Sequence, residues 1–172
     1  MKQAAKSKQV EDSKGIGALH ERPGVLFRRA HQIAVSLFVE ACAPLGLTPP
    51  QHSILFAANA RPNASHAELA RSLGFDRVTV GKVVQSLVER GLLSSEQMPD
   101  NRRDRALRVT PEGKRLLRSA EKPVHDMSQR LLSPLTPKEQ AQLMKLMLKL
   151  TTGLNEASRT PVAVAREENA AQ

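Results

Sequence analysis

The stretch SHAELARSLGFDRVTVGKVVQSLVERGLL, from Ser65 to Leu93, decides the fold of this chain. It opens with a serine that is followed three residues later by Glu68, a capping-box pair that marks the start of a helix. We expect this short helix to end at Gly74, and we expect Asp76 to cap a second helix that ends at Gly91. In the second helix the valines and leucines fall on one face and most polar residues on the other. Two amphipathic helices joined by a tight turn predict a helix-turn-helix.

A basic hairpin is expected directly after the second helix. Residues 92–98 and 105–110 have the composition of two strands, with a turn at 99–104 between them. From residue 100 to residue 118, seven basic residues outnumber three acidic ones, so the net charge of this region is +4 (7 − 3). They are Arg102, Arg103, Arg105, Arg108, Lys114, Arg115 and Arg118 against Asp100, Asp104 and Glu112. An arginine-rich hairpin behind a helix-turn-helix predicts a winged helix-turn-helix that binds DNA.

Two helices are expected before this unit. Pro23 can occupy the first turn of a helix whose apolar stripe repeats with helical spacing and stops near Pro44 and Gly46. Thr48 and Gln51 form a second capping-box pair, which predicts another helix to about residue 60.

Two more helices are expected after the hairpin. Thr110 can cap a long helix that ends around residues 133–134, and Pro123 should interrupt and kink it, because proline lacks a backbone donor. Thr136 and Glu139 form a third capping-box pair, which opens the last helix. Its apolar residues cover more surface than one buried stripe: Leu143, Met144, Leu146, Met147, Leu148, Leu150 and Leu154. Because an isolated domain would expose much of this surface, we expect a homodimer formed through the terminal helices.

The expected fold is mainly α-helical with a small β wing. The winged helix-turn-helix DNA-binding domain occupies residues 47–110, and a helical dimerisation region is formed by residues 21–46 and 111–156. Residues 1–20 and 157–172 lack apolar periodicity, so we expect a disordered basic arm and a disordered tail.

Composition narrows the choice of partner. The chain has 172 residues and a formal net charge of +9, which favours a polyanion. With four Phe and neither Trp nor Tyr, it has too few aromatic rings to stack unpaired bases, so duplex DNA is the expected nucleic acid. A single Cys excludes an internal disulfide. Residues 32–39, an uncharged apolar run of the first half, are too few to span a bilayer, and no signal sequence is evident, so a cytoplasmic location is expected.

Three parts of the winged unit supply candidate DNA contacts. The second helix fits the major groove, where Arg77 is the best candidate to read a base. Other contacts to base edges or phosphates are expected from Thr79, Lys82 and Gln85. The amino terminus of the first helix, at Ser65 and His66, can offer backbone donors to a phosphate. Arginines at the hairpin tip can enter the minor groove, and the candidates there are Arg102, Arg103 and Arg105.

Other function classes fit the sequence less well. An enzyme would need a nucleophile with a base, a carboxylate pair, a metal-ligand cluster or a phosphate-binding loop, and none is evident, so we expect neither catalysis nor a metal or cofactor. The last helix is apolar around too much of its circumference for a membrane-surface helix. A ligand-independent protein that coats DNA by charge alone remains an alternative. A redox-responsive regulator is another, although the helix dipole near Cys42 disfavours a reactive thiolate.

Several short motifs, taken together over residues 23–155, resemble the MarR family of bacterial transcriptional regulators. They are Leu47-Thr48-Pro49-Pro50-Gln51, Glu68-Leu69-Ala70, Val78-Thr79-Val80 with Leu87-Val88-Glu89-Arg90-Gly91-Leu92, and Thr110-Pro111-Glu112-Gly113. The resemblance implies a two-fold dimer on a pseudo-palindromic operator, usually a repressor, that small aromatic acids or oxidants release. The Asp-x-Arg pattern of the family's wing fits residues 100–105 in two registers, so the arginine that enters the minor groove stays open.

A narrower resemblance, at residues 22–34 and in the second helix of the unit, is to regulators of nicotinate degradation, the NicR and BpsR branch. It implies a hydroxylated nicotinate as effector. A planar heteroaromatic carboxylate needs a flat apolar slot and a few cationic or donor groups. The candidate ligand-binding residues are Arg22, Arg28, His31 and His52.

Overall fold

The computed structural model describes residues 17–98 and 101–163. The predicted basic arm up to residue 16, the hairpin residues 99–100 and the predicted tail from residue 164 lie outside this described part.

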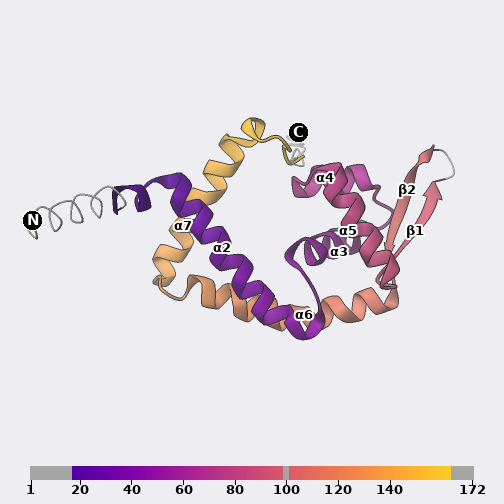
Figure 1. The fold of residues 1–172 in the computed structure, drawn as a ribbon, viewed down its shortest axis with the longest axis horizontal. Helices are drawn as coiled ribbons and strands as arrows, with labels where there is room; N and C mark the ends of the chain where they lie inside the picture. The colour runs from indigo at the N-terminus through magenta and orange to yellow at the C-terminus, as the bar shows by residue number, and fades with distance from the viewer. Residues whose placement is uncertain (1–16, 99–100, 164–172) are drawn as a thin grey trace, which may run out of the picture.

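Two groups of elements make up the molecule (Figure 1). The long helices are α2 (Pro23–Cys42), α6 (Pro111–Leu132) and α7 (Pro137–Gly153), with short 3-10 turns η1 (Ala43–Leu45) and η2 (Asn155–Ala157). The second group holds α3 (Pro49–Ala60), α4 (His66–Leu73), α5 (Arg77–Glu89) and the hairpin of β1 (Leu93–Met98) and β2 (Asn101–Val109). We call this second group the DNA-binding lobe, after the DNA-binding domain that the sequence predicts for residues 47–110. The predicted class, mainly α-helical with a two-stranded wing, is confirmed.

Local hydrogen bonds set the starts of the helices. Thr48, Ser65 and Thr136 each accept a hydrogen bond from the backbone N–H three residues on, and the side chain of that residue bonds back to the backbone of the cap. Asp76 caps α5, and Thr110 caps α6, through the same forward bond. The five helix starts that the sequence predicts from capping side chains are therefore confirmed.

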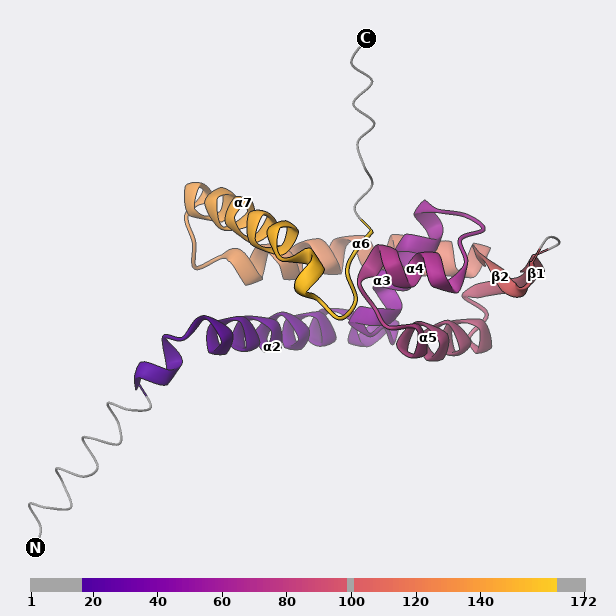
Figure 2. The same ribbon diagram turned by 90° about the horizontal axis from the view of Figure 1, so that it is seen from above.

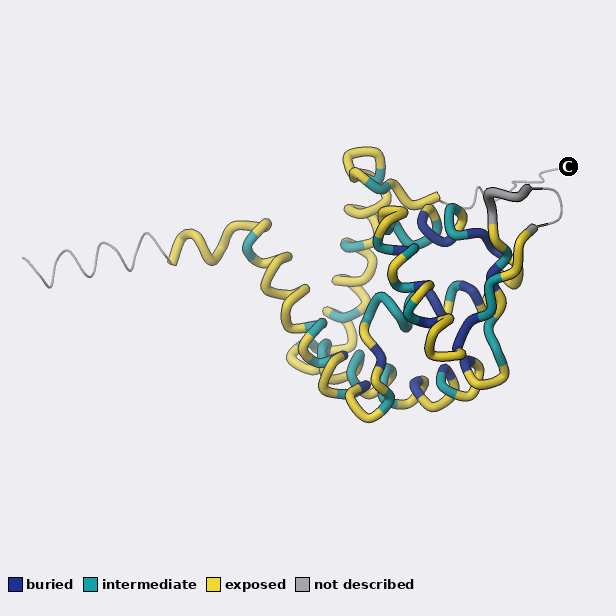
Figure 3. Tube along the Cα trace, turned by 45° about the vertical axis from the view of Figure 1, so that its right-hand side comes forward, coloured by how far each residue is buried: buried dark blue, intermediate teal, exposed yellow. Residues whose placement is uncertain are grey.

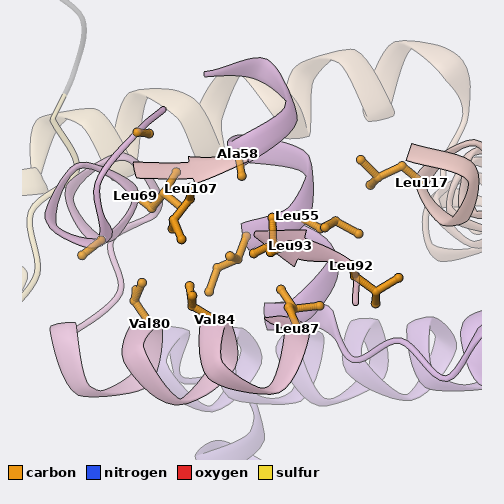
Figure 4. Packing of buried hydrophobic residues seen from close by; sticks show 13 residues of the cluster. Leu55, Ala58, Leu69, Val80, Val84, Leu87, Leu92, Leu93, Leu107 and Leu117 are labelled. Atoms are coloured by element: carbon orange, nitrogen blue, oxygen red, sulfur yellow. The ribbon is translucent and has the colours of Figure 1, made fainter. Parts of the chain in front are cut away.

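One apolar core holds the DNA-binding lobe together (Figure 4). Val80, Val84 and Leu87 of α5 point into it, as the sequence pattern predicts, and they meet Leu55 of α3 and Leu107 of β2. These five side chains are at most 2% exposed. Burial on this scale fixes the inner face of α5 and leaves its opposite face on the surface.

A smaller core joins α2 to α6, where Phe38, Cys42 and Leu47 pack around Ala120. At the surface, the Arg130 guanidinium of α6 donates to the Glu40 carboxylate of α2 at 2.8 Å. This junction holds α2 against α6.

The wing differs from the sequence prediction in its turn. The strands pair antiparallel from Leu93 opposite Val109 to Gln97 opposite Arg105, and then the register shifts so that Met98 pairs with Asn101. β2 therefore begins at Asn101, and the predicted turn over residues 99–104 is too long. A register shift of this kind depends on cross-strand pairing, which strand propensity does not encode.

The interruption expected at Pro123 is also wrong, because α6 runs as one helix from Pro111 to Leu132 with the proline inside it. Proline removes one backbone donor, and packing against α2 at the smaller core offsets that loss.

The ends of the described part extend past the predicted boundaries. Residues 17–20 are helical, whereas the arm was expected to reach residue 20. Residues 157–163 do not leave the surface as a tail, because the Thr160 hydroxyl and the Ala163 backbone N–H bond to the end of α4. Isolated hydrogen bonds between distant residues have no periodic signal in a sequence.

The long helices are exposed along much of their length (Figure 3). α7 has no buried residue, and Leu146, Leu148 and Leu154 are 54%, 62% and 60% exposed. On α2, Leu26 and Ile33 are about half exposed, at 52% and 50%. The chain by itself thus leaves uncovered the apolar surface that the sequence predicts for a dimer interface.

Candidate nucleic-acid interface

The outer face of α5 is the central part of the candidate interface. Arg77 is the first residue of this helix and is exposed, as are Lys82 and Gln85. Val78, on the same face, is 67% exposed. With the inner face locked in the core, these side chains project from a rigid helix, which is the arrangement that a major groove accepts.

Thr79 and Asp76 form the cap of this helix. The carboxylate of Asp76 accepts from the Thr79 backbone N–H at 2.8 Å and from its hydroxyl at 2.6 Å. The bond from the hydroxyl, followed by the backbone bond, lowers the pKa of Asp76 below its ordinary value. The Thr79 hydroxyl is therefore engaged in the cap, and its predicted DNA contact would compete with Asp76. Farther along the outer face of α5, the side-chain amide of Gln85 donates to the Glu89 carboxylate at 2.9 Å.

The amino terminus of α4 is occupied by its own capping box. Ser65 is only 5% exposed, and its backbone N–H donates to the Glu68 carboxylate at 2.7 Å. The bonds from Ser65, with the backbone bond the larger cause, lower the pKa of Glu68. This carboxylate covers the helix end that a phosphate would approach, so Ser65 suits a phosphate contact less well than the sequence suggests. His66 follows it as the first residue of α4 and is half-buried.

Of the predicted wing arginines, the structure describes the side chain of Arg105. Arg105 folds back along the hairpin, where Nε donates to the Ser95 hydroxyl at 2.8 Å and Nη2 to the Ser95 carbonyl at 2.7 Å. Arg102 and Arg103 lie in β2, and their side chains are outside the described part. Of the three predicted wing arginines, Arg105 therefore uses its guanidinium for hydrogen bonds within the hairpin.

Two arginines that the sequence does not mark as site residues hold parts of the interface in place. Arg108 Nε donates to the Asn63 side chain at 2.6 Å and ties the base of the wing to the loop before α4. Arg90, at the end of α5, donates to the Gly46 carbonyl at 2.9 Å and to the Gln51 side chain at 3.2 Å. These bonds span 45, 44 and 39 residues, so nothing in the local sequence could have found them.

The four predicted ligand residues are divided between two places. His52 of α3 is half-buried with its ring 5.6 Å from that of Phe38 and 6.2 Å from that of Phe56. Burial lowers the pKa of His52, which favours the neutral form of the imidazole. Arg22, Arg28 and His31 are exposed on the amino-terminal half of α2 or just before it. Within one chain, the contacts described for these residues do not join His52 to the other three.

A cavity of about 530 Å³ lies between α2, α4, α7 and residues 155–162. Its walls are mainly apolar and carry no charged side chain. The lining includes Phe27, Leu73, Met147, Leu150, Leu154 and Val162. None of the four predicted ligand residues lines it.

The described residues give little support for a redox-active cysteine, a metal site or a membrane-spanning helix. Cys42 is fully buried, and burial raises the pKa of its thiol, which disfavours the nucleophilic thiolate that a redox sensor needs. Residues 17–98 and 101–163 hold no group of three or more His, Cys, Asp or Glu side chains suited to a metal. No single helix there is long and apolar enough to cross a membrane; α2 with η1 and α3 meet that test only as a pair bent by 71°.

Comparison with known proteins agrees with this geometry. A model of the MarR family matches residues 45–104. The PcaV transcriptional regulator from Streptomyces coelicolor is 32% identical, over 78% of this chain and 98% of that one, with a TM-score of 0.68. The transcriptional repressor CouR, solved bound to a 23-mer DNA duplex, is 29% identical over 79% of this chain and 96% of that one, with a TM-score of 0.74.

BpsR from Bordetella bronchiseptica, whose DNA binding is regulated by 6-hydroxynicotinic acid, is also similar. It is 27% identical over 77% of this chain and 94% of that one, with a TM-score of 0.73. PcaV has likewise been solved in complex with its natural ligand. Several regulators thus match at comparable identity, and the nicotinate branch does not stand out among them.

Proposed function

Because the chain belongs to the MarR family of winged helix-turn-helix transcriptional regulators and is not an enzyme, we propose that it is a dimeric repressor that binds a pseudo-palindromic operator in duplex DNA in the cytoplasm. The observation that carries the proposal is α5, which buries one face in the core and presents Arg77 and Lys82 on the other. CouR, a repressor of similar fold bound to a DNA duplex, supports it.

The two-fold axis of such a dimer determines the symmetry and the half-site spacing of the operator. Two copies of α5 would enter successive major grooves on one face of the duplex, with half-site centres about 34–36 Å apart. The open apolar surface of α7 and the first half of α2 would form the interface. Two half-sites bound at once also explain why the dimer would discriminate an operator from random DNA.

Replacing Arg77 with alanine tests the base-reading role. We expect the preference for operator over random duplex to fall by about 1–3 kcal/mol, because a bidentate contact from arginine to guanine carries that much discrimination. Lys82→Ala serves as the comparison, since a phosphate contact weakens binding to both duplexes equally. Binding isotherms on the two duplexes at one fixed salt concentration provide the measurement.

Equal losses on operator and random DNA for Arg77→Ala would favour the alternative function, a protein that coats DNA by charge alone. A wild-type protein with no preference for any promoter sequence would do the same.

We further propose that an aromatic or heteroaromatic acid, such as a hydroxynicotinate, releases the repressor from DNA. The ligands of PcaV and BpsR support an effector for this chain. Of the four candidate residues, His52 is best placed to bind a planar ring, because Phe38 and Phe56 flank it and its neutral imidazole can donate a hydrogen bond. Arg22, Arg28 and His31 are proposed as the contacts of the carboxylate.

An effector must bind more tightly to the dimer geometry that misfits the operator. Titration of nicotinate derivatives, salicylate and other aromatic acids into the protein–promoter complex is expected to weaken DNA binding by about 5–150-fold for at least one compound. The variant His52→Phe keeps an aromatic ring between Phe38 and Phe56 but removes the donor. It should bind DNA normally and lose the response. If no compound weakens a specific complex, the effector part of the proposal is wrong.

A further inference from the structure

Residues 155–163 form a strap that runs from the end of α7 to the DNA-binding lobe (Figure 2). Two hydrogen bonds hold it there. The Thr160 hydroxyl donates to the Gly74 carbonyl at 2.7 Å, and the Ala163 backbone N–H donates to the Arg71 carbonyl at 2.9 Å. The partners in the lobe are 86 and 92 residues away along the chain, so the strap is a long-range tie.

The strap is internally braced. The Asn155 side chain donates to the Val162 carbonyl at 3.0 Å and accepts from the Val162 backbone N–H at 2.9 Å. Between them, the Thr160 backbone N–H donates to the Ser158 hydroxyl at 3.1 Å. Asn155 therefore closes a loop that presents Thr160 in a fixed orientation before it meets α4.

The end of α4 is suited to this contact. Carbonyls in the last turn of a helix lack partners within the helix, and the strap supplies donors to the Arg71 carbonyl and, just beyond the helix, to the Gly74 carbonyl. Gly74 has a φ of +65°, and a Cβ there would lie 3.1 Å from Val162 Cγ2 and 3.2 Å from the Thr160 carbonyl oxygen. Glycine thus serves both the turn of the helix-turn-helix and the close approach of the strap.

The position of the strap allows it to restrict rotation of the DNA-binding lobe. The chain passes between the long helices and the lobe at η1 and at the start of α6, both along the lower side of the lobe in Figure 1, and the strap reaches α4 at the upper side. Attachments on one side allow the lobe to rotate about them, and a tie on the opposite side resists that rotation. Thr160 and Pro161 also line a 310 Å³ cavity with Asp76 and Arg77, at the start of α5.

We propose that the strap fixes the DNA-binding lobe relative to α7 and thereby sets the operator half-site spacing that the dimer accepts, with Thr160 as a positioning residue. This inference rests on the proposed function, since it assigns a role within a dimer that binds two half-sites. Because α7 supplies the proposed dimer interface, a lobe tied to α7 keeps its recognition helix at a set distance from that of the partner subunit. A freed lobe would tolerate a wider range of spacings.

The test compares Thr160→Val with Thr152→Val in the full chain. Valine keeps the shape of threonine and removes only the hydroxyl, and Thr152 is an exposed residue of α7 outside the strap. Affinities are measured for the operator and for two versions with the half-site spacing changed by one base pair in either direction. Asn155→Ala, which opens the loop of the strap, is the second test variant.

Wild type and Thr152→Val are expected to show the same preference for the native spacing. Thr160→Val should reduce that preference by about fivefold, which corresponds to the loss of one hydrogen bond. Asn155→Ala, which removes both bonds to Val162, should reduce it by at least as much. Unchanged preferences in both strap variants, with wild-type folding, would overturn the proposal.

A second measurement separates this inference from the proposed function. In the protein without DNA, amide hydrogen exchange at Ala163 should be about fivefold faster in Thr160→Val than in wild type, because the neighbouring tie is lost. Exchange that stays unchanged would show that the strap is not held by Thr160. A wild-type protein with no specific operator would overturn the proposed function and the spacing role together, and the exchange rates would still decide whether the strap ties α4.

Discussion

Ending the chain before Thr136, which removes α7, is expected to abolish dimerisation and operator binding together. Binding of two linked recognition helices gains about 10²–10⁴-fold over binding of one, so the truncated protein should lose affinity for the full palindrome by this factor. α7 buries none of its residues within its own chain, and the DNA-binding lobe has a separate core. We therefore expect the shortened protein to remain folded and to be a monomer in analytical ultracentrifugation.

A point variant separates the interface from the strap, which the truncation also removes. Leu146 is 54% exposed in one chain, so glutamate at this position leaves the fold of the monomer intact but places a charge in the dimer interface. Ala141→Glu introduces the same charge at an exposed residue on another face of α7, and it should remain dimeric. A monomer that binds the full palindrome with native affinity would contradict the proposed architecture.

Gly113→Ala is expected to destabilise the fold strongly. Gly113 lies in the first turn of α6, and a Cβ there would lie 2.2 Å from the Leu92 carbonyl oxygen and 2.8 Å from Val109 Cγ1. The Leu92 carbonyl cannot retreat freely, because it accepts from the Thr110 backbone N–H at 3.1 Å. Overpacking of a buried site costs about 1–3 kcal/mol or more. The free energy of unfolding from urea titration should fall by at least this amount.

Gly81→Ala is the matched control for this substitution. Gly81 lies inside α5, and a Cβ there meets nothing within 4 Å. The same change should stabilise the protein by about 0.8–1 kcal/mol, because alanine favours a helix interior over glycine. Both variants are compared with wild type at one protein concentration, since dimerisation contributes to the measured stability. If both variants lower the free energy of unfolding by the same amount, the close contact at Gly113 is not the cause of the destabilisation.

The helix starts were predictable from sequence because a capping box is a local bond between residues three apart. Ser65 with Glu68 and Thr136 with Glu139 carry both partners of that bond in the sequence itself. The inner face of α5 was predictable for a similar reason, since the spacing of its valines follows the helical repeat. Together these local signals were enough to predict the winged helix-turn-helix.

The site was only partly predictable, because its details depend on contacts between distant residues. The sequence marks Arg105 as a basic residue, and only the folded hairpin shows that it bonds to Ser95. Candidate ligand residues were chosen by chemistry, yet the packing of α2 on α3 brings Phe38 to His52 and leaves His31 exposed. The strap was missed altogether, since Thr160 and its partner Gly74 share no sequence pattern.

The central claim is that two copies of α5, held by a dimer, read an inverted repeat in successive major grooves. In vitro selection of the full-length protein on a library of random DNA duplexes tests this claim most directly. The claim predicts an enriched inverted repeat whose half-site centres are about 10–10.5 base pairs apart, bound by two chains per duplex. Enrichment of no sequence, or of a single half-site bound by one chain, would contradict it.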